Sequence, residues 1–165
     1  MMDKPKRPAF DKAANLLARR MMTEKQVREA LAKADSKSGG YPADEIEDAV
    51  ARLKELGYID DKAYAERYLE VLIDKKRGRR RIREEMRRRG IDVALIDETI
   101  SAGFADEIER ENAVALTEKI IAGLPEGTDR RFAAQRISRR LIGQGYQFDL
   151  INSVIDEAFS RISDE

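Results

Sequence analysis

Apolar residues recur three and four positions apart along most of the chain, which is the spacing of one face of an α-helix. Ala13, Leu16 and Leu17 mark a first helix, and Val27 and Leu31 mark a second. The period-two alternation of a half-buried strand is essentially absent. The pattern therefore predicts an all-α protein.

Capping residues and glycines predict where the first helices begin and end. Thr23 and Gln26 have the spacing of a capping box at the start of the second helix. Residues 36–40, Ser-Lys-Ser-Gly-Gly, interrupt the pattern. Pro42 suits the first turn of a third helix, which we expect to stop at Gly57. The apolar residues of this third helix are Ile46, Val50, Leu53 and Leu56.

The same cycle of three helices follows twice more. Asp60 or Asp61 caps a helix that we expect Gly78 to end, Gly90 stops the next, and Asp92 opens a short one. Their apolar residues are Tyr64, Ala65, Tyr68, Leu69 and Leu72, then Ile82 and Met86, then Leu95, Ile96 and Ile100. The last three helices run over 108–121, around Ile137 and Leu141 to a stop at Gly145, and from Leu150 to Phe159.

Shifting the chain by 55 residues aligns these cycles with one another. Val27, Ile82 and Ile137 coincide, and Gly90 falls on Gly145. The first copy agrees less well after position 34, because its loop is about five residues longer. We expect three tandem three-helix repeats over 1–59, 60–103 and 104–165. Stacked as nearest neighbours, they would form an elongated, curved, helix-turn-helix-like array.

Composition excludes most catalytic chemistry. The chain has no Cys and no His, which removes disulfides, thiolate nucleophiles, imidazole bases and Cys/His zinc sites. We therefore expect no cofactor, no metal and no enzymatic activity. The first 20 residues carry charges throughout, and no apolar run reaches membrane-spanning length. We expect a cytoplasmic monomer with no membrane partner.

The formal net charge is zero, but the basic residues are segregated. Between Lys75 and Arg89, ten Lys or Arg residues face only Glu84 and Glu85, a local net charge of +8. Repulsion on that scale favours a polyanion or an acidic partner surface. The candidate binding residues are Lys75, Lys76, Arg77, Arg79, Arg80, Arg81, Arg83, Arg87, Arg88 and Arg89.

The arginines of this segment separate into stripes when Ile82 and Met86 face inward. One flank carries Arg80, Arg83 and Arg87, the other carries Arg77, Arg81 and Arg88, and Arg79 and Arg89 fall nearer the core. Guanidinium groups bind phosphates and carboxylates bidentately, which suits a nucleic-acid backbone or an acidic protein groove. The alternative is a solvated helix face. No aromatic residue interrupts the segment, so we expect phosphate contacts there rather than base stacking.

Two other groups have secondary interpretations. The third copy carries a weaker basic cluster, a secondary candidate for binding: Arg130, Arg131, Arg136, Arg139 and Arg140. We expect structural roles for three tyrosines. Tyr64 and Tyr68, one helical turn apart, pack into the second core, and Tyr58 seals the joint between the first two units.

At that joint the sequence resembles the RecX family of recombinase regulators. The matching residues are Leu56-Gly57-Tyr58-Ile59-Asp60-Asp61, then Tyr64-Ala65 and Tyr68, then Gly78, Ile82, Glu85-Met86 and Gly90-Ile91. In the first unit, Arg19-Arg20-Met21-Met22-Thr23, followed by Val27, is similar to the family's Arg-Arg-x-x-Ser…Leu element. Thr23, Val27 and Met86 depart from the family's Ser, Leu and Leu, but they conserve capping or packing.

The resemblance implies tandem three-helix repeats without catalytic activity. It also implies binding to the RecA recombinase, especially to its filament on DNA, and damping of ATP hydrolysis, strand exchange and coprotease function. DNA binding, single- or double-stranded and of low sequence specificity, is implied as well.

Two other functions remain open from the residues alone. One is a DNA-binding regulator of helix-turn-helix type, which needs Asn or Gln beside Arg to read base edges. The basic segment lacks that combination. The other is a helical scaffold whose arginines meet an acidic protein. Scattered carboxylates are the only residues that would support an enzymatic function.

Overall fold

The computed structural model describes residues 8–34 and 39–163, which form nine α-helices and no strand. The all-α prediction is confirmed. Residues 36–38 of the expected loop lie outside the described residues, as do residues 1–7 at the start of the chain. In chain order the helices are α1 (Pro8–Leu17), α2 (Glu24–Lys33), α3 (Ala43–Glu55), α4 (Asp61–Asp74), α5 (Arg79–Arg88), α6 (Val93–Gly103), α7 (Asp106–Ala122), α8 (Arg130–Gln144) and α9 (Phe148–Ser163).

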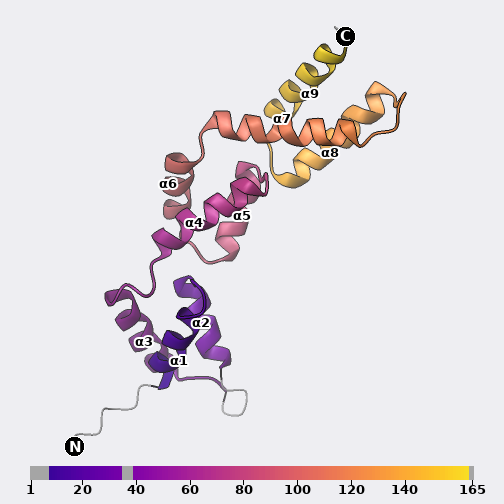
Figure 1. Cartoon of the computed structure of the whole chain (residues 1–165). Coiled ribbons are helices and arrows are strands. Elements are labelled where there is room, and N and C mark those ends of the chain that lie inside the picture. Colours follow the sequence, from indigo (N-terminus) through magenta and orange to yellow (C-terminus); the bar gives the residue numbers. More distant parts are fainter. Residues whose placement is uncertain (1–7, 35–38, 164–165) are drawn as a thin grey trace, which may run out of the picture.

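The helices form three groups of three that follow one another in a row (Figure 1). The first and third helices of each group pack together: α1 with α3, α4 with α6 and α7 with α9. Each group has its own hydrophobic cluster, built around Leu53, Met86 and Ile137 respectively. The group that contains α1 and the group that contains α9 lie at opposite ends of the row, so the described part of the molecule is elongated (Figure 1).

The unit boundaries that the sequence suggests stay a prediction, with one difference in packing. Those boundaries place Phe104 at the start of the third unit, but its buried side chain belongs to the second cluster, beside Leu72 and Ile100. The cluster thus reaches one residue past the end of α6, to its C-cap Phe104.

Several predicted helix boundaries are confirmed by the cap geometry. Thr23 is the N-cap of α2 and makes both hydrogen bonds of a capping box with Gln26. Asp60, not Asp61, caps α4 by accepting a hydrogen bond from the Ala63 amide. Gly145 ends α8 in the left-handed conformation, with φ of 93°.

The predicted helix stop at Gly78 is wrong. Helix α4 ends at Asp74, with Lys75 as its C-cap, and Lys76 makes the left-handed turn with φ of 58°. Gly78 is instead the N-cap of α5, in an extended conformation and without a capping side chain. A glycine serves there because the backbone of the next unit lies against it.

The middle helices α2, α5 and α8 meet end to end, through two joints that use equivalent positions. At the first joint, the Thr23 hydroxyl donates to the carbonyl oxygen of Arg89 at 2.5 Å. At the second, the Gly78 amide donates to the carbonyl oxygen of Gln144 at 2.8 Å. Both pairs match under the shift of 55 residues. Each joint places a helix N-terminus against the C-terminus of the following middle helix, an arrangement that the helix dipoles favour.

The described residues also show what the fold does not contain. None of their helices combines the length and the apolar character needed to cross a lipid bilayer. Within the same residues, no group of three or more acidic side chains has an arrangement suited to a metal ion.

Candidate partner-binding groove

The basic segment is anchored as its apolar residues predict. Ile82 and Met86 are fully buried in the second cluster, which fixes the orientation of α5. The basic residues around them fall into three groups. Some lie at the joints between units, some pair with acidic side chains, and some have no partner among the described residues.

Arg79 holds the second and third units together. Its Nε donates to Glu109 Oε2 at 2.7 Å, and its Nη2 donates to the Phe104 carbonyl oxygen at 2.7 Å and to Asp106 at 2.6 Å. The guanidinium also lies over the Phe104 ring, and the side chain is only 20% exposed. Because these contacts hold the guanidinium inside the protein, we assign Arg79 a structural role.

Neighbouring basic residues serve the same joint. Lys76 Nζ donates to Asn112 Oδ1 at 2.8 Å, and its carbonyl oxygen accepts from the buried hydroxyl of Tyr146. Burial raises the pKa of that hydroxyl, so Tyr146 remains a donor. Arg80 donates through Nη2 to the Ile142 carbonyl oxygen, at 2.7 Å. These contacts hold α7 and the end of α8 against the start of α5 and the residues just before it.

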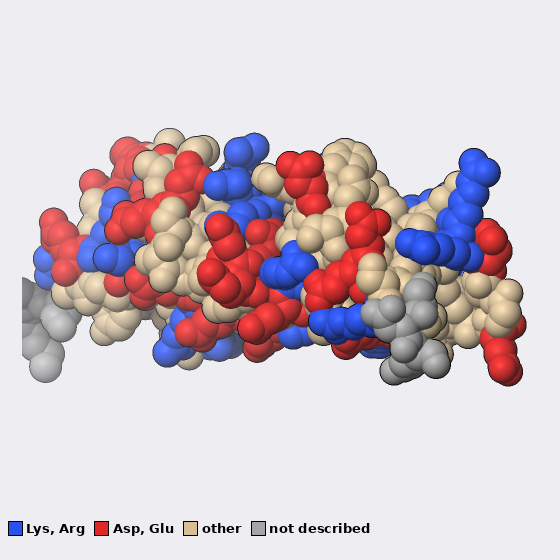
Figure 2. Space-filling model, turned by 90° about the horizontal axis from the view of Figure 1, so that it is seen from above, with Lys and Arg blue, Asp and Glu red and all other residues tan. Residues whose placement is uncertain are grey.

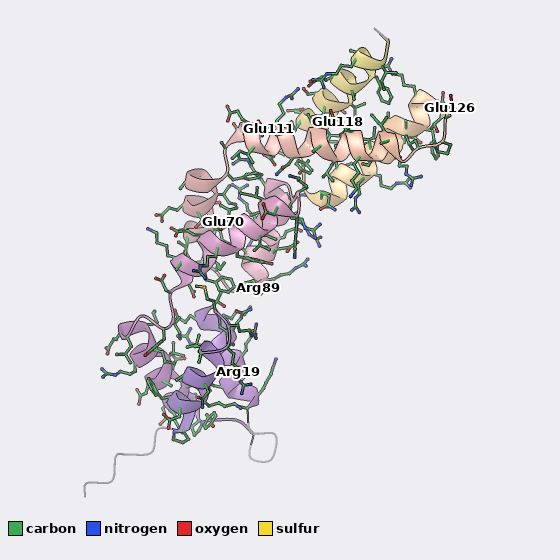
Figure 3. All side chains as sticks on the ribbon, viewed as in Figure 1. Arg19, Glu70, Arg89, Glu111, Glu118 and Glu126 are labelled. Carbon is green, nitrogen blue, oxygen red and sulfur yellow. The ribbon has the colours of Figure 1, made fainter. Side chains whose placement is uncertain are left out.

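Arg89 lies at the other joint, between the first and second units (Figure 3). Its Nη1 donates to the Tyr64 hydroxyl at 2.8 Å, and its guanidinium lies over the ring of Tyr68. Tyr64 is buried and Tyr68 packs against the same cluster, so their predicted structural roles are confirmed. Tyr58 does not seal the joint as expected, because its side chain is 61% exposed.

Four other basic residues of the segment face solvent. Arg83 pairs with Asp97 at 3.1 Å on the surface. Lys75, Arg87 and Arg88 are exposed and make no ion pair or side-chain hydrogen bond with the described residues. The ten basic residues thus do not act as one patch, since several of them are committed to the two joints.

A groove of about 870 Å³ opens where the start of α5 meets α8. Five arginines line it: Arg77 just before α5, Arg81 from α5, and Arg136, Arg139 and Arg140 from α8. Its other lining residues are Ile120, Phe132, Gln135, Gly143 and Gln144, so no carboxylate among the described residues lines it. The structure therefore brings part of the first basic cluster and part of the second, about sixty residues apart in sequence, into one site.

Helix α8 presents one stripe to this groove. Phe132, Arg136, Arg139 and Gly143 follow one another at intervals of three and four residues, which places them on one face of a helix. The opposite face carries Ala133, Ile137 and Leu141, which are buried in the third cluster. Burial of that face fixes which residues α8 shows to the groove.

One carboxylate stands behind the groove and is shared by Arg77 and Arg81. Glu85 Oε1 lies 3.0 Å from Arg81 Nε and 3.4 Å from Arg77 Nε, and Glu85 Oε2 accepts from the Tyr68 hydroxyl. Burial alone would raise the pKa of Glu85, but the hydrogen bonds from Arg81 and Tyr68 and the two arginine charges hold that pKa below its ordinary value. Glu85 therefore stays ionised at neutral pH and offsets one of five positive charges.

The three arginines of α8 are different. Arg136, Arg139 and Arg140 are exposed and have no hydrogen-bond or ion-pair partner for their side chains among the described residues. The other two secondary candidates lie outside the groove: Arg130 covers the ring of Phe159 at 4.9 Å, and Arg131 is exposed. The available positive charge of the groove thus comes mainly from α8.

Sequence reasoning missed the aromatic side of this groove. Phe132 lies between arginines in the sequence and could have been found from its position on the outer face of α8, four residues before Arg136.

The surface charge of the molecule is not spread evenly. Figure 2 shows acidic and basic side chains mixed over one face, with acidic ones gathered over its middle.

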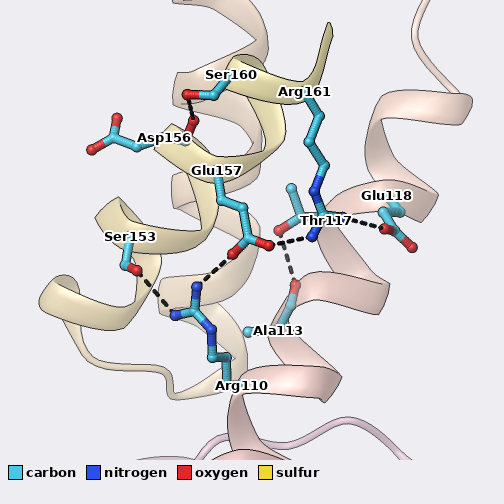
Figure 4. A network of polar contacts seen from close by, with 9 residues as sticks. All are labelled: Arg110, Ala113, Thr117, Glu118, Ser153, Asp156, Glu157, Ser160 and Arg161. Carbon is cyan, nitrogen blue, oxygen red and sulfur yellow. Dashed lines mark hydrogen bonds and ion pairs between the residues drawn. The ribbon is translucent and has the colours of Figure 1, made fainter. Parts of the chain in front are cut away.

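Charged residues at the far end of the third unit are used for packing. Arg110 on α7 donates to Ser153 and to Glu157 on α9, and Arg161 pairs with Glu157 and with Glu118 (Figure 4). This network ties α7 to α9, and its two arginines are matched by two glutamates.

Comparison with known proteins identifies the family. The model of the first three-helix domain of RecX matches residues 9–53, and that of its second three-helix domain matches residues 60–100. A regulatory protein RecX from Trichlorobacter lovleyi is 32% identical over 146 residues, which cover 86% of this chain and 93% of the relative. One from Clostridium botulinum (strain Alaska E43) is 32% identical over 149 residues, which cover 90% of this chain and 67% of the relative.

Solved structures agree with the sequence relatives. The crystal structure of RecX from Lactobacillus salivarius matches with a TM-score of 0.79 and 25% identity, over 90% of this chain and 93% of that one. A second crystal structure, of a regulatory protein RecX, matches with a TM-score of 0.75 and 26% identity, over 90% of this chain and 70% of that one. The chain belongs to the RecX family of regulatory proteins.

Proposed function

We propose that this protein is a non-catalytic regulator of the RecA recombinase that binds the RecA filament on DNA and reduces its ATP hydrolysis, strand exchange and coprotease activity. Membership of the RecX family supports a regulator. The groove with five arginines is the observation that carries the mode of binding, because it offers a polyanion a site on a chain whose formal net charge is zero.

The elongated shape supports binding along a filament rather than at a point. Three units in a row present a long surface for their mass, and the groove lies at the joint between the second and third units. In the proposed complex the array follows the filament groove, and the arginines contact DNA phosphates or acidic recombinase surface. Bound there, the protein would alter filament stability or block access by partners.

The test is RecA-dependent ATP hydrolysis on single-stranded DNA, titrated with the wild-type protein and two matched variants. Arg139→Ala/Arg140→Ala removes an adjacent pair from the groove, and Arg19→Ala/Arg20→Ala removes an adjacent, exposed pair from the first unit. We expect the first variant to lose inhibition and the second to retain it. If the wild type changes neither ATP hydrolysis nor filament length, the proposal fails.

A second candidate is a regulator that binds duplex DNA directly. Gln135 lies beside Arg136 on the groove side of α8, which is a pairing that can read base edges. A protein of that kind binds duplex tightly without RecA. Titration of free duplex with the purified protein therefore separates the two functions.

A further inference from the structure

Phe132 is the one exposed aromatic ring among the residues that line the groove with five arginines, and such a ring suits a ligand with a flat apolar face. Phe132 is 54% exposed, although the fold buries Phe104 and Phe159. Phe148 is also exposed, at 66%, but it does not line the groove. Exposure of an aromatic ring to water is unfavourable, and here the ring stands at one end of a row of guanidinium groups.

The spacing of the groove matches a ligand that alternates negative charge and flat rings. Arg136 follows Phe132 by one helical turn, Arg139 and Arg140 follow by two, and Gly143 follows by three. The stripe is about 16 Å long at the rise of an α-helix. Ile120 of α7 adds a second apolar side chain to the lining, which therefore combines apolar surface with a cationic row.

We propose that this groove binds a single strand of nucleic acid, with the phosphates on the α8 arginines and an unpaired base stacked on Phe132. The inference rests on the proposed function and deepens it, because it identifies the partner of the groove as the DNA strand rather than the recombinase.

The ring distinguishes a single strand from the other polyanions. Stacking on an aromatic side chain requires a base whose face is free, and it tolerates every base because each has a π-face. In a duplex the faces are covered by neighbouring base pairs, so a duplex would meet only the arginines. An acidic protein surface would likewise use the arginines and leave the ring without a matching partner.

Tryptophan fluorescence tests the stacking directly. The chain contains no Trp, so Phe132→Trp introduces a single reporter at the site, and Phe148→Trp places a matched reporter on an exposed ring outside the groove. The full-length protein is titrated, without RecA, with oligothymidylate, with an abasic strand of the same length, and with duplex. We expect oligothymidylate to quench the indole of the Phe132→Trp variant strongly and that of the Phe148→Trp variant little. We expect the abasic strand and the duplex to quench neither indole.

Affinity measurements make the proposal independent of the reporter. Phe132→Ala and Phe132→Leu should each weaken oligothymidylate binding by about tenfold and leave the affinity for the abasic strand unchanged. Arg139→Ala/Arg140→Ala should weaken binding of both strands and lower the log–log salt slope by about 1.4, at about 0.7 per phosphate.

Three results would overturn the proposal: no binding of oligothymidylate, unchanged fluorescence of the Phe132→Trp variant at saturation, or equal quenching of that variant by duplex. They would leave the RecA titration above unaffected, since the arginines would still be open to a recombinase surface. Conversely, single-strand binding without any effect on RecA would overturn the proposed function alone.

Discussion

A Cβ atom on Gly78 would lie 2.5 Å from the backbone carbonyl carbon of Gly145, and 2.6 Å from the amide nitrogen of Tyr146. The two glycines thus bring the start of α5 and the end of α8 into backbone contact. No flexible side chain separates them, so the position of the third unit depends on this close approach.

Substitution of Gly78 by Ala should therefore open the second joint. The methyl group meets backbone atoms that cannot rotate away, and we expect a loss of about 2 kcal/mol in the free energy of unfolding, typical of overpacking. Urea unfolding measures it. Gly143→Ala is the control, since a Cβ there meets nothing within 4 Å, and it should stabilise α8 by up to about 1 kcal/mol. Equal stability of the two variants would contradict the role of the joint.

Thr23 should cost more to remove than an ordinary helix cap. Its hydroxyl accepts from the Gln26 amide and also donates across the first joint to Arg89. Thr23→Ala should lose about 2 kcal/mol, about half from the cap and half from the joint hydrogen bond. Asp92→Ala, which removes a cap that serves α6 alone, should lose about 1 kcal/mol. Urea unfolding compares them, and identical losses would show that the joint bond adds nothing.

Loss of Arg79 should be severe, because Glu109 would stay buried without its partner. We expect Arg79→Met to cost about 3 kcal/mol in the free energy of unfolding, and Arg79→Met/Glu109→Leu to recover part of that loss. Arg83→Met, which breaks an exposed pair with Asp97, should cost less than about 1 kcal/mol. If both single variants lose the same stability in urea, the Arg79 pair does not hold the joint.

Acid should destabilise the protein partly through Glu85. Its pKa is lowered in the folded state, so its contribution to stability is present above the unfolded value of about 4.3 and is lost as the pH falls through the folded value. The Tm of the wild type should therefore fall more steeply than that of Glu85→Gln between about pH 5 and pH 3.

The control for this experiment is Glu126→Gln, an exposed side chain on the loop before α8 (Figure 3). It removes one carboxylate away from the groove and should follow the wild-type profile. Parallel profiles for Glu85→Gln and the wild type would contradict the role assigned to the arginines around Glu85.

Local signals predicted most of the fold. The Thr23 capping box and the glycine stop at Gly145 act within one helical turn, and the spacing of Ile82 and Met86 fixes the inner face of α5 without reference to other units. The role of Gly78 could not be predicted in this way, because its surroundings are set by Gly145, 67 residues later, rather than by its neighbours in the chain.

For the same reason, the sequence predicted the basic residues of the groove but not that they line one site. Helical spacing places Arg79 nearer the core than Arg77, but its ion pair with Glu109 of the third unit cannot be predicted from that spacing. Likewise, the position of Phe132 on the outer face of α8 can be predicted from the sequence, but its place in one groove with Arg77 and Arg81 cannot. Contacts between units determine these roles, and such contacts cannot be predicted from the number of charged residues in a segment.

The hydrogen bonds across the two joints share one kind of acceptor but differ in their donor. Each relies on a main-chain carbonyl as the acceptor, at Arg89 and at Gln144, which exists whatever side chain occupies the position. The donor is a threonine hydroxyl in one joint and a glycine amide in the other. Equivalent hydrogen bonds across the two joints are therefore made by different donors, so at these positions the repeats resemble one another more closely in geometry than in residue identity.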